Sequence, residues 1–380
     1  MPIQNTKVSV ASTDDYREIF VSGRPLLDLR APVEFARGAF PGATNLPLMT
    51  DDERAAVGTR YKQQGQQAAI ELGHQLVSGT TREARMAAWL KWCKKHPDGR
   101  IYCFRGGLRS ATVGAWLAAA GARPILVEGG YKALRRYLLE QLETLAQALD
   151  LLLICGRTGT GKTLVIEALP QALDLEGRAR HRGSAFGASQ EPQPAQIGFE
   201  NAVAVDLLRL QAAGFGSGAR PVVLEDEGRL IGRCLVPPTL QDRMKAIPRV
   251  IVDEPLDARV GLIIRDYIQQ PLAAMQHNRS REEALDQLEV QLRAALDRIR
   301  RRLGGSRHQD LAAAMADAFH QHRQQDSDTG HATWIAPLLT DYYDPMYDYM
   351  LKQRQGPVLF QGSRSAVLQW LSDQRSVNQG

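Results

Sequence analysis

The chain has 380 residues, which at roughly 100–200 residues per domain suggests two domains. Apolar residues make up 44% of it and charged residues 23%, and these globular proportions exclude a disordered or fibrous protein. The net charge of +5 permits a nucleic-acid partner without requiring one, and the basic excess lies in the first 150 residues.

The four cysteines, Cys93, Cys103, Cys155 and Cys234, form no CxxC pair and show no metal-ligand spacing. A disulfide framework or a zinc site is therefore not expected. The start, MPIQNTKVSV, has no basic or apolar region of a signal peptide, and no apolar run approaches about 18 residues. We therefore expect a cytoplasmic protein with reduced cysteines, no tightly bound metal and no membrane partner.

The first predicted domain covers residues 1–140 and alternates strands with helices. A helix is expected after Ser12, capped by Ser12 or Thr13. Strands are then expected at 25–30, 101–102 and 124–130, a helical insertion at about 51–95, a helix at 110–120 that ends before Gly121, and a connecting helix at 135–149. This alternation predicts an α/β domain with a parallel sheet.

The second predicted domain covers residues 141–380. Its strands are expected at 151–155, 221–226 and 249–254. The first of them, LLLIC, is apolar enough to be buried on both faces of a sheet. After residue 270 the chain is predicted to be helical, because Ser280 and Glu283 form a capping-box pattern and an apolar stripe at spacings of three and four follows them.

The most informative stretch of the first domain runs from Cys103 to Ser110, with the sequence CFRGGLRS, between a predicted strand and a predicted helix. A cysteine there lies near a helix N-terminus, and Arg105 and Arg109 add positive charge, so the nucleophilic thiolate is favoured. The alternative is a small buried apolar side chain, the usual fate of a free cysteine, although flanking arginines make a poor apolar pocket. The alternative is the better interpretation of the other three cysteines.

This domain resembles the rhodanese family. DLRAPVEFARGAFPGATNLPL, at 28–48, is similar to the first rhodanese signature, in which Asp-x-Arg ends a strand. The cysteine loop falls where rhodaneses carry their persulfide-forming cysteine, and LVEGGYKAL, at 126–134, resembles their closing signature without its usual Trp. The resemblance covers roughly 14–139 and implies a rhodanese-like fold. The insertion, with GTRYKQQGQQAAIELGH at 58–74, departs from ordinary sulfurtransferases and argues against plain thiosulfate chemistry.

A phosphate loop opens the second domain. The pattern G-x-x-x-x-G-K-[ST] is matched by Gly156, Arg157, Thr158, Gly159, Thr160, Gly161, Lys162 and Thr163. The match lies between a predicted strand and a predicted helix, which is the context that supports it. In such a loop the backbone N–H groups cradle a diphosphate, Lys162 neutralises its charge and Thr163 can hold Mg²⁺. The pattern does not distinguish a nucleotide from another diphosphate ester.

Acidic residues follow two strands of the second domain. Asp226 is the best candidate for a magnesium shell around the diphosphate. Glu225 and Glu227 are equally well explained as solvated acids at a strand end, and Asp253 is a weaker candidate.

Candidate tRNA-binding residues lie in two segments. His181 and Arg182 belong to HRGSAFG, on a predicted loop. Arg298, Arg301 and Arg302 lie on the predicted long helix, where such a cluster would make salt-sensitive phosphate contacts. The alternative is a solvated helix face. The tyrosines of YYDPMY, at 342–347, either stack on bases or pack a C-terminal helix.

Together and in this order, the two halves closely resemble the bacterial tRNA 2-selenouridine synthase family. The shared motifs are YKQQGQQAAIELG, CFRGGLRS, GRTGTGKT, HRGSAFG, LEDEGRLIG and YYDPMY. The resemblance implies that selenium from selenophosphate replaces sulfur in 2-thiouridine at the tRNA wobble position, so a selenophosphate-supplying enzyme is an implied partner. It also implies a geranyltransferase activity that uses geranyl diphosphate.

We expect the phosphate loop to hold the geranyl diphosphate and Cys103 to carry or position selenium. Arg105 and Arg109 would bind the phosphate of selenophosphate, and Gly73 would shape the same site. Two alternatives stay open. One is a kinase or NTPase with a rhodanese domain as a sulfur sensor. The other is a non-catalytic tRNA-binding protein, against which an intact Cys103 beside two arginines argues.

Overall fold

The computed structural model describes residues 10–187, 191–218 and 220–376. The chain forms two compact units: unit 1 is Met1–Leu145 with Pro194–Ala212, and unit 2 is Ala146–Gln193 with Ala213–Gly380. Residues 1–9, on which the signal-peptide expectation rests, lie outside the described residues. Within the described part of the chain, no helix is long and apolar enough to cross a membrane.

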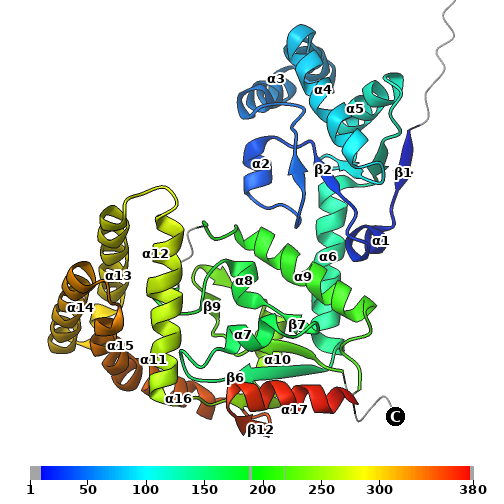
Figure 1. Cartoon of the computed structure of the whole chain (residues 1–380). Coiled ribbons are helices and arrows are strands. Elements are labelled where there is room, and N and C mark those ends of the chain that lie inside the picture. Colours follow the sequence, from blue (N-terminus) through cyan, green and yellow to red (C-terminus); the bar gives the residue numbers. More distant parts are fainter. Residues whose placement is uncertain (1–9, 188–190, 219, 377–380) are drawn as a thin grey trace, which may run out of the picture. The chain divides into compact units, whose positions relative to one another are not determined.

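Unit 1 is built on a five-stranded parallel sheet in the order β1-β5-β4-β2-β3 (Figure 1). Its strands are β1 (Ala11–Thr13), β2 (Leu26–Asp28), β3 (Thr44–Asn45), β4 (Arg100–Tyr102) and β5 (Ile125–Val127). Its helices are α1 (Tyr16–Val21), α2 (Pro32–Ala36), α3 (Asp51–Leu76), α4 (Gly79–Lys95), α5 (Leu108–Ala119), α6 (Gly130–Ala148), which continues into unit 2, and α9 (Gln196–Ala212). The register pairs the last residue of β2, Asp28, with the last residue of β4, Tyr102, so the Asp-x-Arg turn and the cysteine loop start side by side.

The first helix begins later than the sequence predicted. Ser12 and Thr13, the expected caps, belong to β1, which pairs with β5. The cap is Asp15, whose side chain accepts a hydrogen bond from the backbone N–H of Glu18 (2.9 Å). The cap prediction was wrong because strand pairing already uses the backbone of the expected capping residues, and Asp15, directly before the helix, takes the role.

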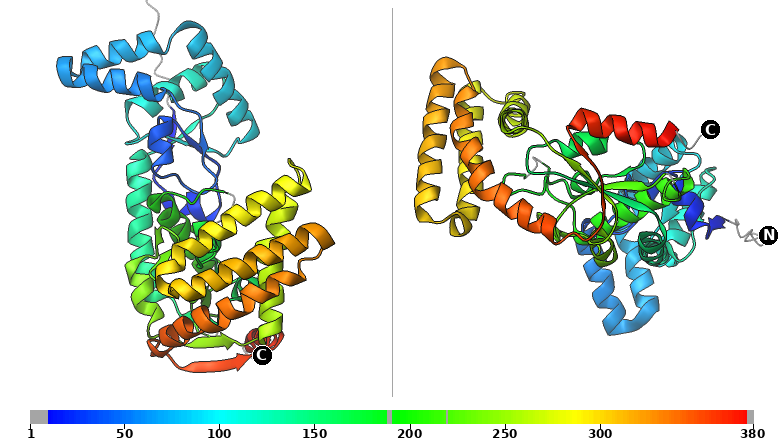
Figure 2. Two further views of the ribbon diagram at one scale, coloured as in Figure 1. Left: turned by 90° about the vertical axis from the view of Figure 1, so that its left-hand side faces the viewer. Right: turned by 90° about the horizontal axis from the view of Figure 1, so that it is seen from below.

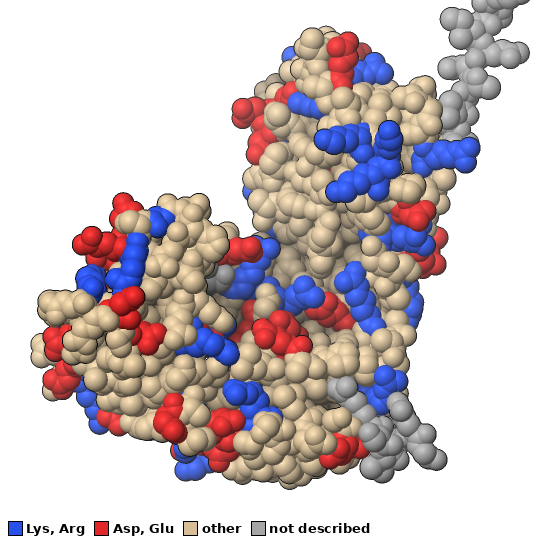
Figure 3. All heavy atoms as spheres, viewed as in Figure 1, with Lys and Arg blue, Asp and Glu red and all other residues tan. Residues whose placement is uncertain are grey.

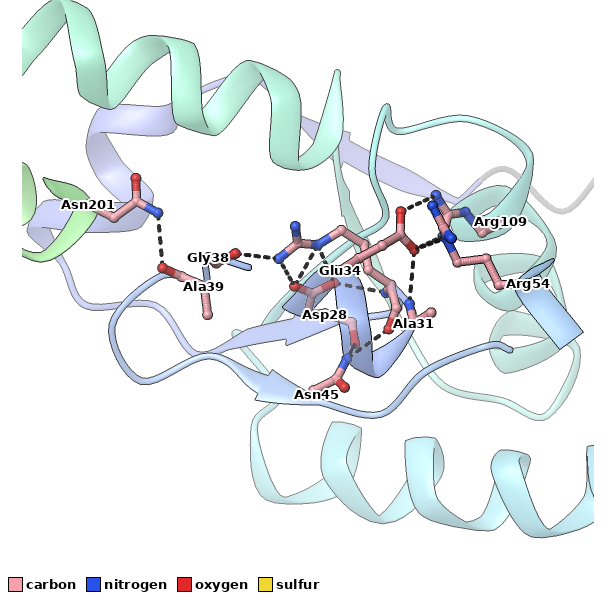
Figure 4. Close-up of polar contacts among 10 residues, drawn as sticks. Asp28, Ala31, Glu34, Gly38, Ala39, Asn45, Arg54, Arg109 and Asn201 are labelled. Carbon is pink, nitrogen blue, oxygen red and sulfur yellow. Dashed lines mark hydrogen bonds and ion pairs between the residues drawn. The ribbon is translucent and has the colours of Figure 1, made fainter. Parts of the chain in front are cut away.

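A buried ion pair holds the turn after β2. Arg30 donates through Nε and Nη2 to Asp28 Oδ2 (2.9 and 2.7 Å), and both side chains are almost completely buried. Nη2 of Arg30 also donates to the Gly38 carbonyl (2.9 Å), and the guanidinium carbon lies 3.6 Å from the ring centroid of Tyr131. Figure 4 shows Asp28, Gly38 and Asn45 around this turn. Because a buried charge without a partner is strongly destabilising, the Asp-x-Arg pair is a structural element of this turn.

Helix α9 lies in unit 1, although it follows the phosphate loop in the sequence. Asn201 Nδ2 donates to the Ala39 carbonyl (2.9 Å; Figure 4), and Arg209 Nε donates to the Phe20 carbonyl (3.0 Å). The predicted division at residue 140 leaves this helix in the second domain. Contacts between residues so far apart leave no periodic trace in a sequence, which is why the pattern of elements did not reveal them.

Unit 2 contains a second parallel sheet, in the order β12-β11-β6-β8-β7, and the antiparallel pair β9–β10. Its strands are β6 (Leu151–Cys155), β7 (Ala172–Leu173), β8 (Val222–Glu225), β9 (Leu230–Ile231), β10 (Cys234–Leu235), β11 (Arg249–Val252) and β12 (Val358–Gly362). Strand β6 lies between β8 and β11 and is buried throughout, which confirms the prediction of a central strand. Helices α7 and α17 pack against each other beside this sheet (Figure 1).

The helices that belong wholly to unit 2 are α7 (Lys162–Glu167), α8 (Leu175–Ala179), α10 (Pro238–Met244), α11 (Leu256–Ile264), α12 (Gln270–Met275), α13 (Arg281–Leu303), α14 (Gly305–Gln325), α15 (Ala332–Leu338), α16 (Asp344–Lys352) and α17 (Arg364–Ser376). Three short helical segments join some of them: the π-helices η1 (Arg265–Gln269) and η3 (Leu339–Tyr343) and the 3₁₀-helix η2 (Thr329–His331). The predicted class, α/β with parallel sheets followed by a helical region, is confirmed.

The long helix α13 begins at the predicted capping box. Ser280 Oγ accepts a hydrogen bond from the N–H of Glu283 (3.3 Å), and Glu283 Oε2 accepts one from the N–H of Ser280 (2.9 Å). Every member of the predicted apolar stripe, from Leu285 to Leu303, is buried in a core shared with α14 and α15. Figure 2 shows α13 and α14 lying side by side.

A chain of hydrogen bonds is buried in this helical core. The indole N–H of Trp334 donates to His331 Nδ1 (3.0 Å), and His331 Nε2 lies 3.2 Å from His322 Nδ1. Because an indole can only donate, His331 Nδ1 carries no proton, and Nε2–H donates to His322. Burial, and then the neighbouring His322, lower the pKa of His331 to about 4.

We expect this histidine to make unit 2 acid-sensitive. The unfolded chain takes up the proton near pH 6.5 and the folded chain only near pH 4, so stability is constant above this window and falls as the pH drops through it, by on the order of 3 kcal/mol. Urea unfolding followed by circular dichroism at pH 7 and pH 4.5 measures the loss. His331→Gln should flatten the pH dependence, whereas the exposed His277→Gln should not. Equal slopes in both variants would contradict the assignment.

Candidate functional site

The cysteine loop joins β4 to α5 and is fixed by α6. The N–H of Tyr131 donates to the carbonyl of Cys103 (2.8 Å), and the N–H of Lys132 donates to that of Phe104 (3.0 Å). Gly106 and Gly130 both have positive φ, and a Cβ atom on Gly130 would lie 2.4 Å from the Gly106 nitrogen. The close approach of the two backbones therefore requires glycine at Gly106 and Gly130, which explains one glycine of the Gly-Gly pair in each motif.

Cys103 lies at the bottom of this loop with 2% of its surface exposed. Its Sγ is 3.2 Å from Ser110 Oγ, and the Ser110 hydroxyl also lies within hydrogen-bond distance of the Gly107 carbonyl (3.0 Å). A serine has one hydroxyl proton, so Ser110 can accept from the thiol while donating to Gly107, or donate to a thiolate. Ser110 is thus a partner of Cys103 that the sequence analysis did not single out.

Replacing Ser110 by alanine should slow the alkylation of Cys103 by iodoacetamide at neutral pH about tenfold. A hydrogen bond to a charged group contributes roughly 1.5–3 kcal/mol, and the variant loses the donor that stabilises the thiolate. Peptide mass spectrometry after timed labelling measures the rate, with the half-buried Cys93 as internal reference. An unchanged rate would show that Ser110 does not support the thiolate.

The two predicted arginines of the loop have different surroundings. Arg105 is exposed, whereas Arg109 Nη1 donates to Glu34 Oε2 (2.9 Å). Glu34 also pairs with Arg54 (3.2 Å) and accepts from the N–H of Ala31 (3.1 Å), as Figure 4 shows. Burial alone would raise the pKa of Glu34, but Arg109, Ala31 and Arg54 hold it below its usual value. Arg109 therefore keeps a fixed position beside the loop.

A cavity of about 540 Å³ opens beside Cys103. The cysteine loop, α5 and the inserted helix α3 form its walls, and they include Arg105, Arg109 and Gly73. The structure thus brings all the candidate residues of the first domain to one cavity.

The phosphate loop joins the buried strand β6 to α7. Lys162 Nζ donates to the Gly156 carbonyl (2.8 Å), and Thr160 Oγ1 donates to the Arg157 carbonyl (2.9 Å). Gly161 has positive φ (81°), a conformation that side chains other than glycine rarely adopt. The loop is therefore curled in the conformation that its sequence pattern predicts.

Two arginines join this loop to α16. Arg259, almost fully buried, donates from Nε to the Thr158 carbonyl (2.9 Å) and from Nη1 to Asp344 Oδ2 (2.9 Å). Arg157 donates from Nη2 to Asp348 Oδ2 (2.9 Å). Both aspartates belong to the YYDPMYD segment. Its buried tyrosines, Tyr343 and Tyr347, pack inside unit 2 and do not offer free ring faces for stacking.

Two acidic residues near the phosphate loop have different partners. Thr163 Oγ1 donates to Glu176 Oε2 (2.9 Å), a carboxylate that the sequence analysis did not single out. Asp226, by contrast, pairs with Arg354, and its Oδ2 accepts from the Cys155 thiol (3.4 Å). Burial, and then Asp226, raise the pKa of Cys155 well above its usual value, as expected of an inert buried cysteine.

Two further carboxyl groups next to Asp226 are buried. Burial, and then the charge of Glu176, raise the pKa of Glu225 and of Glu227 well above the usual value. The interpretation of these residues as solvated acids was therefore wrong. Within the described residues, no group of three or more His, Cys, Asp or Glu side chains could hold a metal ion.

Two clefts of unit 2 contain the remaining candidate residues. The first, of about 360 Å³, is lined by Lys162, Thr163 and Glu176 and by apolar side chains that include Leu262 and Met346. The second, of about 670 Å³, is lined by three of the candidate tRNA-binding residues, His181, Arg182 and Arg298, and by apolar side chains of α12 and α13. Arg301 and Arg302 are exposed on α13 and are not part of this wall.

Charge is unevenly distributed over the surface. Figure 3 shows Lys and Arg side chains gathered on unit 1 around α4 and α5, whereas the helical region of unit 2 mixes both signs on the same face. The basic excess of the first 150 residues is therefore partly concentrated in one region of unit 1.

Comparison with known proteins finds relatives over most of the chain. The family model for the tRNA 2-selenouridine synthase AAA domain matches residues 149–378. The tRNA 2-selenouridine synthases of Alcanivorax borkumensis and Hahella chejuensis are 50% and 49% identical to this chain. The matches cover 95% of this chain and 98% of the Alcanivorax protein, and 96% of this chain and 95% of the Hahella protein.

One solved structure is also similar. It is the N-terminal domain of a putative ATP/GTP binding protein from Clostridium difficile 630, with 29% identity and a TM-score of 0.30 over 34% of this chain and 99% of that chain. The near-complete matches to curated relatives at about half identity, together with the family model, decide the assignment. The chain belongs to the tRNA 2-selenouridine synthase family.

Proposed function

We propose that the chain replaces sulfur by selenium in 2-thiouridine at the tRNA wobble position, with selenophosphate as donor and an S-geranyl intermediate made from geranyl diphosphate. Membership of the family makes it an enzyme of the transferase type that acts on tRNA. The observation that carries the two-step proposal is the presence of two separate loops suited to anions, one at Cys103 in a rhodanese-like unit 1 and one at Lys162 in unit 2.

The first step is assigned to unit 2. The thiocarbonyl sulfur attacks C1 of geranyl diphosphate, the C1–O bond breaks, and the N3 proton of the base is released. Lys162 and the loop N–H groups stabilise the departing diphosphate. The cleft suits this substrate because Leu262, Ile263 and Met346 add apolar surface next to the phosphate loop. A P-loop in this role needs no nucleotide hydrolysis.

The second step is assigned to unit 1. Alkylation makes C2 electrophilic and turns the sulfur into a thiol leaving group. Selenium of selenophosphate attacks C2, the C2–S bond breaks, and geranylthiol leaves with the proton of the selenophosphate. Water then cleaves the P–Se bond, giving phosphate and returning a proton to N3. Arg105 and Arg109 bind the phosphate group, and Cys103 carries or positions the selenium.

Binding of Mg²⁺ together with the diphosphate would involve Thr163. The Asp226 carboxylate is buried and pairs with Arg354, so it is not free to bind a metal ion. Glu176, by contrast, contacts the Thr163 hydroxyl. A Mg²⁺ ion at this loop would therefore use Glu176 in the role that the sequence suggested for Asp226. Such an ion neutralises charge on the leaving diphosphate.

We assign tRNA contacts to His181, Arg182 and Arg298 in the second cleft of unit 2, and to the exposed Arg301 and Arg302 on the same helix as Arg298. Guanidinium groups bind phosphate oxygens without reading sequence. The donor selenophosphate comes from a partner enzyme that makes it.

Nucleoside mass spectrometry tests the proposal. A 2-thiouridine tRNA is incubated with the protein and geranyl diphosphate, with or without selenophosphate. We expect S-geranyl-2-thiouridine without selenophosphate and 2-selenouridine with it. Rapid ATP hydrolysis that is unaffected by tRNA, together with no modified nucleoside, would instead favour a kinase or NTPase.

A further inference from the structure

We propose that the cavity beside Cys103 binds the geranyl chain of S-geranyl-2-thiouridine while selenium displaces the sulfur. This inference rests on the proposed function and assigns a ligand to a part of unit 1 for which the reaction scheme above gives no role. It makes unit 1 selective for an alkylated base that carries a long apolar group.

The lining of the cavity combines charged, polar and apolar side chains. The charged ones are Arg105 of the cysteine loop and Arg109 at the start of α5. The apolar ones include Val57 and Ile70 of α3 and Trp116 of α5, and the polar ones are Gln66, His74 and Thr112. The arginines suit an anion, and the apolar side chains suit a hydrocarbon.

Selenophosphate alone does not account for such a cavity. It is a small anion that needs only the N–H groups of the cysteine loop together with Arg105 and Arg109. The cavity of about 540 Å³ lies within the range of roughly 300–1,000 Å³ that is typical of sites for larger organic ligands. The geranyl chain is the one extended apolar group among the reactants of the proposed reaction, so it is the occupant that the interior fits.

The rim of the cavity carries two large apolar side chains that are exposed. Tyr61 of α3 and Leu108 of α5 are 57% and 56% exposed. Large exposed apolar side chains at the edge of a cavity mark a surface that an apolar ligand can cover. A geranyl chain that covered them and entered the cavity would bring the base, and hence C2, to the cysteine loop.

Contacts within unit 1 hold the α3 and α5 side of the cavity in place. Helix α3 is kinked at Gly65, whose φ of 83° and ψ of −174° interrupt the helix. Trp116 stacks on Trp89 with ring centroids 6.4 Å apart, and the Arg82 guanidinium carbon lies 4.2 Å from the Trp116 ring centroid. A wall held in place by these contacts reduces the entropy cost of binding the chain.

Two short RNAs with one modified base test the proposal, one carrying S-geranyl-2-thiouridine and one S-methyl-2-thiouridine. Both present the same electrophilic C2, but only the first has a chain to fill the cavity. With selenophosphate and the full-length protein, we expect kcat/KM for the S-geranyl RNA to exceed that for the S-methyl RNA by about 100-fold. That ratio corresponds to burial of about three to four CH₂ groups of the chain, at roughly fourfold each.

Ile70→Trp should fill the cavity and abolish most of this preference. Its kcat/KM for the S-geranyl RNA should fall about 100-fold, and that for the S-methyl RNA should stay within about threefold of wild type. Gln67→Trp is the matched control, because Gln67 lies on the same helix, is exposed and is not part of the wall. It should behave as wild type. Geranyl transfer from geranyl diphosphate, assigned to unit 2, should be unchanged in both variants.

The outcomes separate this inference from the function on which it rests. If the wild-type protein does not convert the S-geranyl RNA, the proposed function is wrong, and the cavity assignment fails with it. If the wild type converts it, but Ile70→Trp does so equally well or loses both RNAs to the same extent, only the cavity assignment is overturned. Equal kcat/KM of the wild type for the two RNAs also overturns it.

Discussion

Replacing Lys162 by alanine should lower the rate of geranyl transfer about 10²- to 10³-fold, the usual cost of removing one group that stabilises developing charge. Its Nζ lies 2.8 Å from the Gly156 carbonyl, inside the curled loop where a diphosphate would bind. As the C1–O bond breaks, negative charge develops on the departing diphosphate, and the ammonium neutralises it. The rate is measured as formation of S-geranyl-2-thiouridine at saturating geranyl diphosphate.

Two controls accompany the Lys162 variant. Lys245→Ala removes an exposed lysine of the same unit that pairs only with Asp242 in a surface contact (2.6 Å), and it should keep the wild-type rate. The Lys162 variant should also convert a pre-geranylated RNA with selenophosphate at the normal rate. Unchanged geranyl transfer in Lys162→Ala would show that the phosphate loop does not hold the geranyl diphosphate.

Replacing Cys103 by alanine should abolish selenation and leave geranyl transfer intact. In unit 1, Cys103 contacts Ser110 and lines the same cavity as Arg105 and Arg109. The phosphate loop belongs to unit 2. Mass spectrometry should therefore find S-geranyl-2-thiouridine accumulating in the presence of selenophosphate, with 2-selenouridine reduced at least 10³-fold. A loss of that size is the scale expected when the group that carries or positions the attacking selenium is removed.

Cys93→Ala is the matched control for this variant. Cys93 is half-buried in α4, and burial raises the pKa of its thiol, so it should be dispensable for both products. Loss of geranyl transfer together with selenation in Cys103→Ala would contradict the division of the two steps between the two units.

Features that depend on residues close together in the sequence could be predicted from the sequence. The phosphate loop, the central strand before it and the capping box of α13 each lie within a few residues of sequence. Their physical causes are equally local: backbone conformation, hydrogen bonds three residues apart, and one apolar helix face. The α13 residues of the helical core could be predicted for the same reason, because they form one periodic apolar stripe.

Partners of the site residues were not predictable. Glu34 accepts a hydrogen bond from Arg109, which is 75 residues away in the sequence. Glu176 contacts Thr163. Arg354 pairs with Asp226, which is 128 residues away in the sequence. For Glu34 a signal existed, since it lies two residues after the proline that starts α2, within the rhodanese-like signature. Nothing in the sequence distinguished Glu176 from the other acidic residues. Asp226 was the expected magnesium ligand because it follows a strand, and the sequence does not show that it pairs with Arg354.

The sequence by itself determined two α/β domains, a cysteine flanked by arginines and a phosphate loop, because each is encoded by residues that are contiguous or periodic. Only the tertiary structure decided that α9 packs in unit 1, that Asp226 pairs with Arg354, and that α3 forms a wall of the cavity beside Cys103. These features arise from contacts between segments far apart in the chain. Their geometry is set by which elements pack together, and no local pattern records it.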